Sequence, residues 1–265
     1  MEKLLEVKNL KVDFYLDDRI IRAVDGVNFD LKANEAAVLA GESGSGKTIT
    51  ALALTRNLAA NAKIVSGEIN FRGRKLFELD ETQLSRIRGK EIAYIFQEPV
   101  SFLNPVFSVG NQISEAIMLH QQKNQKQAYA EALRLLQEVK ISEPERVFFS
   151  YPHQLSGGMN QRAFLAMSLA CQPRLLIADE PTTSLDVTIE KEILDLLLDL
   201  KSRFGFSLLF ITHNLSIAKK VAQRVFIMYK GKIVEEQDTE SIFKKPQHFH
   251  TKELIAAYEK IGRIS

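Results

Sequence analysis

The sequence predicts an α/β fold in which helices flank a parallel sheet and a helical segment is inserted between strands. Strand-like apolar runs at residues 175–178 and 207–211 enclose a helical pattern at residues 189–200, an alternation typical of parallel sheets covered by helices. Between residues 97 and 155 apolar residues recur at helical spacing, which predicts the inserted segment. Strand-like segments are concentrated in the first hundred residues, which indicates a separate N-terminal β subdomain.

The elements expected along the chain follow from periodicity and from glycine and proline positions. Early strands are expected at residues 4–7, 24–29, 36–40, 67–73 and 92–96. An Ala- and Leu-rich helix is expected at residues 49–60, before a polar break at residues 61–63. A hairpin over residues 225–234, turning at Lys230 and Gly231, precedes a charged helical tail.

Three functional domains are expected from this order of elements. The catalytic core is formed by residues 1–96 and 156–240, the helical subdomain by residues 97–155, and a short C-terminal tail by residues 241–265.

Composition excludes several classes of protein. The 265 residues carry 35 Lys and Arg against 33 Asp and Glu, with the signs mixed along the chain, so no nucleic-acid partner is indicated. The most apolar stretch, residues 163–178, is interrupted at Pro173, so no membrane span is expected. Glu2 and Glu6 at the start are unlike a secretory signal, and we expect a cytosolic chain. The single cysteine, Cys171, forms no internal disulfide, and a buried thiol is expected there.

A phosphate-binding loop is the strongest chemical signal. The pattern G-x-x-x-x-G-K-[ST] is matched by Gly41, Glu42, Ser43, Gly44, Ser45, Gly46, Lys47 and Thr48. A strand precedes the loop and a helix follows it, which is the context the motif requires. Backbone N–H groups and the helix dipole would hold a polyphosphate, with Lys47 at the β and γ phosphates and Thr48 at magnesium. The alternative is a glycine-rich turn, which the flanking elements disfavour. By itself the loop indicates only NTP binding, because kinases, GTPases, helicases and transport ATPases all use it.

A second acidic site follows the apolar run at residues 175–178. Asp179 and Glu180 come at the carboxyl end of this strand, where open α/β sheets bind ligands. Asp179 suits magnesium, which prefers oxygen ligands, and Glu180 suits polarising the water that attacks a γ phosphate. A solvated turn is the alternative, and the phosphate loop upstream favours the functional interpretation.

The string at residues 155–162, Leu-Ser-Gly-Gly-Met-Asn-Gln-Arg, resembles the signature motif of the ATP-binding cassette (ABC) ATPases. Ser156 is suited to cap the following helix, and Gly157 and Gly158 leave backbone N–H groups open as a second anion site. A plain capped helix is the alternative. The resemblance implies that this site binds the γ phosphate of ATP held on a partner subunit's phosphate loop, and hence a head-to-tail dimer. It also implies a P-loop NTPase (RecA-like) core with an N-terminal antiparallel β subdomain and an inserted helical subdomain.

Other elements of the family match in order. Gln97 matches the Q-loop glutamine, which contacts metal and water and links to the membrane subunits. Asp186, with residues 184 and 185, matches the D-loop at the nucleotide, and His213 matches the switch histidine at the γ phosphate. The resemblance therefore implies Lys47, Gln97, Glu180 and His213 as catalytic residues, and Thr48, Gln97 and Asp179 as the magnesium site. Phe14 or Tyr15 stacks on the adenine, and Phe14 is favoured.

Within the family, the chain is most similar to the ATPases of dipeptide, oligopeptide and nickel importers. The resemblance is carried by residues 23–29, 96–99, 103–106, 109–113 and 177–187. Longer peptide-importer members carry a cysteine-containing extension after the region matched by residues 248–254, which is not found before Ser265, so peptides and nickel or metal chelates both remain candidate cargoes. His248 and His250 are interpreted as part of a segment that starts a helix capped by Thr251, in preference to a metal site.

The resemblance implies a subunit that couples ATP hydrolysis to import from the cytoplasmic face of the membrane. The implied partners are two permease subunits, a second ABC ATPase that is either a related chain or another copy, and indirectly an extracytoplasmic solute-binding protein. A coupling helix of each permease would enter a groove near residues 97–106. A nucleic-acid or ribosome remodeller would carry two cassettes or a long coiled coil, and a P-loop kinase would not need residues 155–159, so both alternatives are disfavoured.

Overall fold

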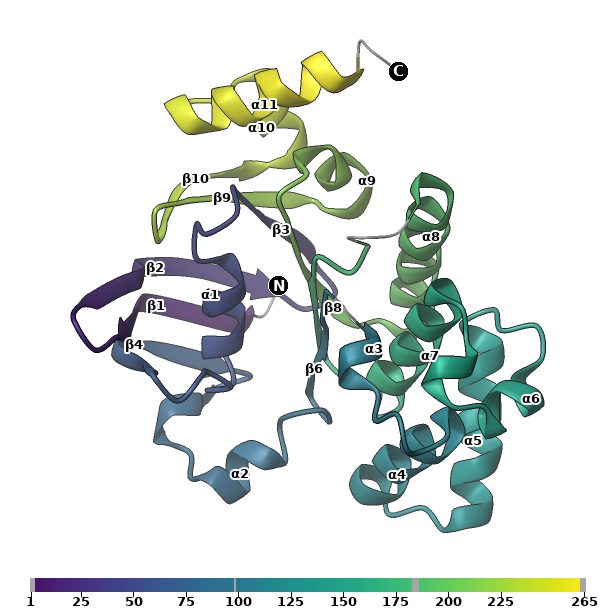
Figure 1. Ribbon diagram of the computed structural model, residues 1–265. Helices are drawn as coiled ribbons and strands as arrows, with labels where there is room; N and C mark the ends of the chain where they lie inside the picture. Colours follow the sequence, from purple (N-terminus) through teal and green to yellow (C-terminus); the bar gives the residue numbers. More distant parts are fainter. Residues whose placement is uncertain (1–2, 98, 183–185, 263–265) are drawn as a thin grey trace. The chain divides into compact units, whose positions relative to one another are not determined.

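A computed structural model describes residues 3–97, 99–182 and 186–262 of the chain (Figure 1). The chain divides into two compact units, one formed by Met1–Leu84 with Ser207–Ser265 and the other by Ser85–Phe206. This division by packing differs from the functional domains expected from the sequence, which stay a prediction. Each unit is described by itself below.

An antiparallel sheet forms one part of the first unit. Its strand order is β2 (Ile20–Lys32), β1 (Lys3–Tyr15), β4 (Ala62–Phe71) and β5 (Arg74–Lys75). Leu5, Leu10 and Val12 of β1 are almost completely buried, so the strand presents apolar side chains to the core. Gly67 has a φ of +118°, and a Cβ there would lie 2.7 Å from the Cα of Leu10. The close approach of β4 to its neighbour β1 at this point therefore requires glycine.

The remaining strands of this unit follow the order β10-β9-β3-β8. β3 (Ala36–Ala40) is fully buried and runs parallel to β8 (Ser207–Thr212) and β9 (Arg224–Tyr229), whereas β10 (Lys232–Asp238) returns antiparallel to β9. The predicted hairpin turn is confirmed, because Lys230 and Gly231 have φ values of 45° and 80°. The helical segments of the first unit are α1 (Lys47–Ala53), η1 (Leu76–Glu78), η3 (Leu215–Ile217), α9 (Ala218–Val221), α10 (Thr239–Lys244) and α11 (Phe249–Gly262). A further helix, α2 (Glu81–Ser85), ends at the boundary between the two units.

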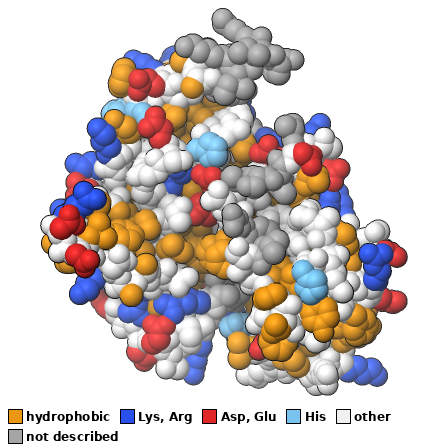
Figure 2. All heavy atoms as spheres, in the orientation of Figure 1, with side chains coloured by type: hydrophobic (Ala, Val, Ile, Leu, Met, Phe, Trp, Pro, Cys, Tyr) orange, Lys and Arg blue, Asp and Glu red, His pale blue; other side chains and the backbone are white. Residues whose placement is uncertain are grey.

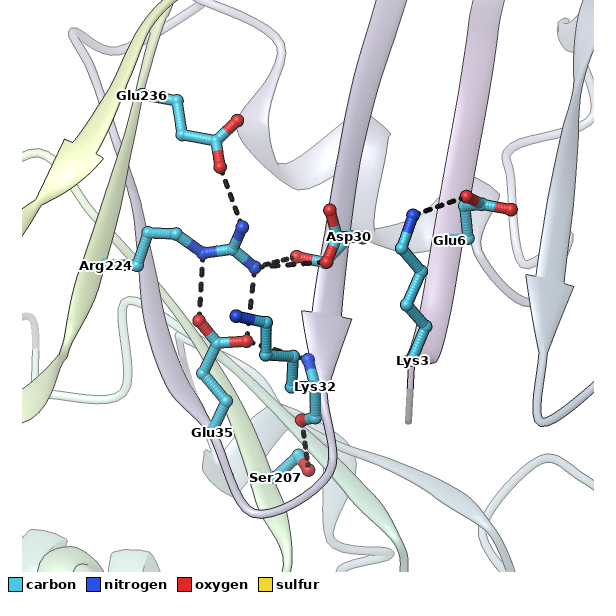
Figure 3. A network of polar contacts seen from close by, with 8 residues as sticks. All are labelled: Lys3, Glu6, Asp30, Lys32, Glu35, Ser207, Arg224 and Glu236. Atoms are coloured by element: carbon cyan, nitrogen blue, oxygen red, sulfur yellow. Dashed lines mark hydrogen bonds and ion pairs between the residues drawn. The ribbon is translucent and has the colours of Figure 1, made fainter. Parts of the chain in front are cut away.

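A polar network around Arg224 joins several strands of this unit. It lies beside residues 30–35, which lead from the end of β2 to the start of β3. Figure 3 shows the Arg224 guanidinium of β9 between the carboxylates of Asp30, Glu35 and Glu236. Ser207, at the start of β8, donates to the Lys32 carbonyl at 3.2 Å, so β2, β8, β9, β10 and the turn before β3 are tied together in one region.

Three local expectations in this unit are wrong. The helix expected at residues 49–60 ends at Ala53, because the chain turns at Arg56, whose φ is +53° and whose guanidinium donates to the Leu79 carbonyl. Residues 62 and 63 of the polar break at 61–63 already belong to β4, which pairs with β1 from Ala62 onward. Thr251 is fully buried inside α11 and does not cap it, since the helix begins at Phe249.

The second unit combines a pair of parallel strands with the predicted helical subdomain. β6 (Ile92–Ile95) pairs with β7 (Leu175–Asp179). The helices are α3 (Pro99–Phe102), α4 (Val109–Gln121), α5 (Gln125–Glu138), α6 (Pro144–Phe149), η2 (Pro152–Gln154), α7 (Gly157–Leu169) and α8 (Val187–Phe204). Gly110 lets the Phe148 ring pack onto α4, because a Cβ there would lie 2.1 Å from the ring. Among the described residues of the whole chain, no helix is both long and apolar enough to cross a membrane.

Candidate functional site

The predicted phosphate loop lies between β3 and α1 in the first unit, as expected. Two of its glycines are required by close backbone approach. A Cβ on Gly41 would lie 2.2 Å from the Met228 carbonyl oxygen, and a Cβ on Gly46, whose φ is +105°, would lie 2.5 Å from the Ala23 carbonyl oxygen. The loop is therefore pressed against β9 and β2, which fixes its path before any ligand binds.

Lys47 and Thr48 differ in exposure at the start of α1. Lys47 is 5% exposed, and its Nζ donates to the carbonyl oxygens of Gly41 at 2.9 Å and Glu42 at 2.8 Å. The ammonium thus closes the loop around itself, in the place where the motif holds phosphate. Thr48 is exposed in the first turn, where its hydroxyl is accessible to a metal ion.

A small cavity of about 150 Å³ adjoins the loop. It is lined by Glu42, Ser43, Gly44, Ser45, Tyr229 and Lys230. Tyr229 ends β9 and Lys230 follows it in the hairpin turn. Neither had an expected role, because the sequence predicts the hairpin but not that it packs beside the phosphate loop. The Ser45 hydroxyl is buried and has no hydrogen-bond partner among the described residues.

His213, the predicted switch histidine, and the phosphate loop each follow one of two neighbouring strands. β3 and β8 are parallel with Ala40 opposite Thr212, so Gly41 and His213 each follow the carboxyl end of adjacent strands. His213 is exposed. The next residue, Asn214, is held in place by the Thr212 hydroxyl, which accepts its backbone N–H at 2.9 Å.

The two aromatic candidates for adenine stacking lie at the end of β1. Phe14 is half-buried and opposite Ile21 of β2. Tyr15 is 40% exposed, and the Lys63 ammonium lies 5.2 Å from the centre of its ring. One face of the Tyr15 ring is thus already beside a cation, and the preference for Phe14 stays a prediction.

In the second unit, β6 and β7 bring Gln97 and the two acidic residues to one edge. The strands are parallel with Ile95 opposite Ala178, so Gln97 follows one strand end and Asp179 and Glu180 end the other. Asp179 is 7% exposed and Gln97 is exposed. Glu180 has a φ of +47°, a left-handed conformation that costs a non-glycine residue about 1–3 kcal/mol and that the surrounding structure must enforce.

The signature turn begins α7 as the sequence indicates. Ser156 is its N-cap, and the Ser156 hydroxyl accepts the Met159 N–H at 3.3 Å, which confirms the predicted cap. A Cβ added to Gly157 would meet no atom within 4 Å, whereas one on Gly158 would lie 3.4 Å from Ile189. The helix start therefore presents Gly157 to open space, as a site for an external anion requires.

Asp186 caps α8 and is exposed. Its carboxylate accepts the Ile189 N–H at 2.9 Å. The other two residues of the matched D-loop, Ser184 and Leu185, lie outside the described residues. A capping role thus accompanies the nucleotide role expected of Asp186.

The predicted residues fall into two sets, each assembled within one unit. The first unit holds Phe14, the phosphate loop and His213, and the second holds Gln97, Ser156, Gly157, Gly158, Asp179, Glu180 and Asp186. Gln161, which was part of the signature string but had no expected role, is buried and contacts the turn after Glu180. A polar residue ahead of the apolar run at residues 163–166 of the same helix was the available signal.

Comparisons with known proteins agree with the motifs. The sequence pattern of the family described as "ABC transporter" matches residues 24–183. The "Probable peptide ABC transporter ATP-binding protein y4tR" of Sinorhizobium fredii (strain NBRC 101917 / NGR234) is 48% identical over 95% of this chain and 76% of its own length. The "Glutathione import ATP-binding protein GsiA" of Escherichia coli (strain K12) is 45% identical over 98% of this chain, which spans only 43% of that relative.

Solved structures show the same fold. The dimeric ATP-binding cassette MJ0796, in a post-hydrolysis state bound to ADP and Pi, has a TM-score of 0.78 and 27% identity over 89% of this chain and 98% of its own. The cbiO1 protein from Clostridium perfringens, part of an ABC transporter complex, has a TM-score of 0.79 over 100% of this chain and 99% of its own; at 23% identity it supports the fold alone. The predicted P-loop NTPase fold is thus confirmed. The chain belongs to the ABC transporter family and is an ATPase of that family.

Proposed function

We propose that this chain is the ATP-binding and hydrolysing subunit of an importer, and that it drives uptake of short peptides through partner permease subunits. The open Gly157 at the start of α7 carries the proposal, because a P-loop enzyme that works alone has no use for a second exposed anion site. The names of the similar proteins from Sinorhizobium and Escherichia support peptide and glutathione cargo, and glutathione is itself a small peptide.

Nucleotide binding is assigned to the first unit. The phosphate loop encloses the phosphates, with Lys47 releasing the Gly41 and Glu42 carbonyls to contact the β and γ phosphates. Phe14 stacks on the adenine and His213 contacts the γ phosphate. Lysine and histidine donors placed before the reaction stabilise the charge that develops on the phosphoryl group.

Hydrolysis is assigned to the second unit. Glu180 accepts hydrogen bonds from the attacking water, and its left-handed backbone keeps the carboxylate in one orientation. The resemblance assigns magnesium to Thr48 of the first unit and to Gln97 and Asp179 of the second, which offer a hydroxyl, an amide and a carboxylate, all oxygen donors of the kind that magnesium prefers. When bound, magnesium would neutralise charge on the phosphates.

Two cassettes would act together as a head-to-tail dimer, with Ser156, Gly157, Gly158 and Asp186 of one subunit facing the nucleotide of the other. The partner cassette is a related chain or a second copy. Closure on ATP moves the helical subdomains, and with them two permeases, at the cytoplasmic face of the membrane. A solute-binding protein outside the cell delivers the cargo.

Exposed apolar side chains support permease contact on the second unit. Phe102 and Val106, in the predicted groove, are 50% and 70% exposed, and Leu119 and Phe149 are 73% and 66% exposed. Figure 2 shows hydrophobic side chains gathered at the lower right of the view, where Figure 1 labels α4 and α6. Contiguous exposed apolar surface is typical of protein–protein contact.

Paired substitutions test the proposed site. Glu180→Gln should leave ATP binding intact, reduce turnover by about 10²-fold or more, and accumulate an ATP-bound dimer detectable by size-exclusion chromatography. Gly157→Asp should stop hydrolysis without weakening nucleotide binding, because its carboxylate meets the partner's γ phosphate. Gly157→Asn, equal in size but uncharged, is the matched control and should be less impaired. Equal turnover of the Asp and Asn variants would contradict the dimer.

The cargo is tested in the assembled importer. With the permeases encoded beside this chain in proteoliposomes, a labelled dipeptide or tripeptide and nickel are offered in parallel with the cognate solute-binding protein. Uptake of peptide, dependent on ATP, is expected. Uptake of nickel alone would replace the peptide assignment by the metal one.

A further inference from the structure

The α7 helix, which begins at the signature turn, carries a buried amide on its inner face. Gln161 is 2% exposed, and its Nε2 donates to the carbonyl oxygen of Pro181 at 2.7 Å. Pro181 directly follows Glu180 and is itself buried. A short hydrogen bond therefore joins the signature helix to the turn that holds the proposed catalytic carboxylate.

The turn after Glu180 depends on such external contacts. Glu180 has a φ of +47°, which is uncommon for a residue with a side chain, and such conformations persist only where the surroundings enforce them. Pro181 has no N–H with which to close a local turn. The next residue, Thr182, is 6% exposed, and its hydroxyl donates to Glu190 of α8 at 3.0 Å. Gln161 and Glu190 thus hold the turn from two helices.

The neighbours of Gln161 on α7 fix the rest of the helix. Asn160 is 2% exposed, and its Nδ2 donates to the Pro152 carbonyl oxygen at 3.0 Å, on the segment that leads into the signature turn. Ser168 donates to the Tyr94 carbonyl oxygen of β6 at 3.0 Å. The helix is therefore bonded to its surroundings both in its first turns and near its end.

We propose that Gln161 is a positioning residue for ATP hydrolysis. Through its hydrogen bond to Pro181, its amide makes the orientation of Glu180 depend on the position of α7. The inference rests on the proposed function, in which Glu180 polarises the attacking water. It adds that the signature turn and the catalytic carboxylate of one subunit move together. When the nucleotide held by the partner subunit binds at Ser156, it fixes the position of α7. The same helix then orients Glu180 towards the nucleotide of its own subunit.

Gln161→Glu is the diagnostic substitution, because it keeps the size and shape of the side chain. Ionised, the carboxylate faces the Pro181 carbonyl oxygen with no proton to donate; protonated, its O–H donates to the same oxygen. We expect kcat at pH 8 to fall about 10- to 100-fold with KM for ATP little changed, since misplacement of a catalytic group by about 1 Å costs this much. The ratio of variant to wild-type kcat should rise as the pH is lowered towards 6.

Two further variants separate positioning from folding. Gln161→Met fills a similar volume without a donor, so it should show a loss of kcat whose ratio to wild type does not change with pH. Arg162→Gln is the matched control on the same helix, because Arg162 also donates to a backbone carbonyl, that of Val139 at 3.1 Å, away from Glu180. It should lower the melting temperature while kcat stays near the wild-type value.

Glu180→Gln, assayed in parallel, distinguishes the two levels of the proposal. If Glu180→Gln is inactive while Gln161→Glu and Gln161→Met keep the wild-type kcat and pH profile, the positioning role is overturned and the proposed function stands. If Glu180→Gln hydrolyses ATP normally, the proposed function fails and the role of Gln161 fails with it. The inference is supported if the ratio of variant to wild-type kcat depends on pH for Gln161→Glu and does not depend on pH for Gln161→Met.

Discussion

Arg224→Met should destabilise the first unit more than the removal of any single exposed charge. The Arg224 side chain is 18% exposed, and its guanidinium bonds Glu35 twice, at 2.9 and 3.1 Å, and Glu236 at 2.7 Å. It also donates to the carbonyl oxygen of Asp30 and lies 3.5 Å from the Asp30 carboxylate. These partners, labelled in Figure 3, come from β2 (Asp30), the turn before β3 (Glu35) and β10 (Glu236). One cation therefore holds strands that are distant in the sequence.

The expected loss follows from what the substitution leaves behind. Methionine keeps an apolar stem near the Phe226 ring, over which the Arg224 guanidinium lies at 4.9 Å, but removes the charge. The carboxylates of Glu35 and Asp30, 10% and 25% exposed, would then lose the guanidinium that pairs with both of them. Removing one partner of a buried ion pair costs about 3–5 kcal/mol. Because solvent screens these carboxylates in part, we expect about 2–3 kcal/mol, or a melting temperature lower by roughly 4–10 °C for a chain of this size.

Thermal unfolding followed by circular dichroism at pH 7.5 measures this difference. Glu236→Gln is the matched control, since the Glu236 side chain is 42% exposed and its loss should cost less than about 1 kcal/mol. Arg224→Lys should fall between the two, because lysine keeps the charge but not the two-pronged bond to Glu35. If Arg224→Met melts at the same temperature as Glu236→Gln, the network does not stabilise the fold and the reasoning is refuted.

Gly41→Ala should weaken ATP binding by about tenfold or more, because its Cβ would lie 2.2 Å from the Met228 carbonyl oxygen and force the phosphate loop away from β9; titration calorimetry with ATP gives the affinity, and an unchanged value would show that the loop can adapt. A different effect concerns the C-terminal segment. Burial alone would raise the pKa of the Glu235 carboxyl, but the backbone N–H groups of Gln247 and His248, which it accepts at 2.8 and 2.9 Å, help to hold that pKa below its ordinary value. The stabilisation is therefore complete above the ordinary pKa and is lost as the pH falls through the lowered one. The protection of the α11 amides, taken as the exchange rate relative to its intrinsic rate at each pH, should fall on acidification in the wild type and be low at every pH in Glu235→Gln. Identical acid sensitivity of the protection in both would exclude Glu235 as the cause.

Much of this protein could be predicted from residue patterns, because its chemistry resides in short contiguous strings. The loop from Gly41 to Thr48 needs glycines where β9 and β2 approach, and their spacing is visible in the sequence alone. Ser156 caps α7 through a bond to a residue three positions away, so that contact is local too. The ends of parallel strands also carry Asp179 and His213 as their apolar runs predict.

Local patterns fail where the deciding contact is distant in the chain. The helix that starts at Lys47 ends earlier than its Ala-rich composition suggests, because Arg56 bonds the Leu79 carbonyl. Thr251 looks like a cap, yet it is buried inside α11.

The sequence by itself determined the family, the fold class and the candidate residues for binding phosphate, metal and water, because each depends on side-chain chemistry over a few neighbouring positions. Only the tertiary structure decided that Gln161 holds the turn after Glu180, that Arg224 joins β9 to β2, β10 and the turn before β3, and that Tyr229 borders the phosphate loop. These contacts join residues far apart in the chain. Their partners are selected by packing of whole strands and helices, which no short string of residues records.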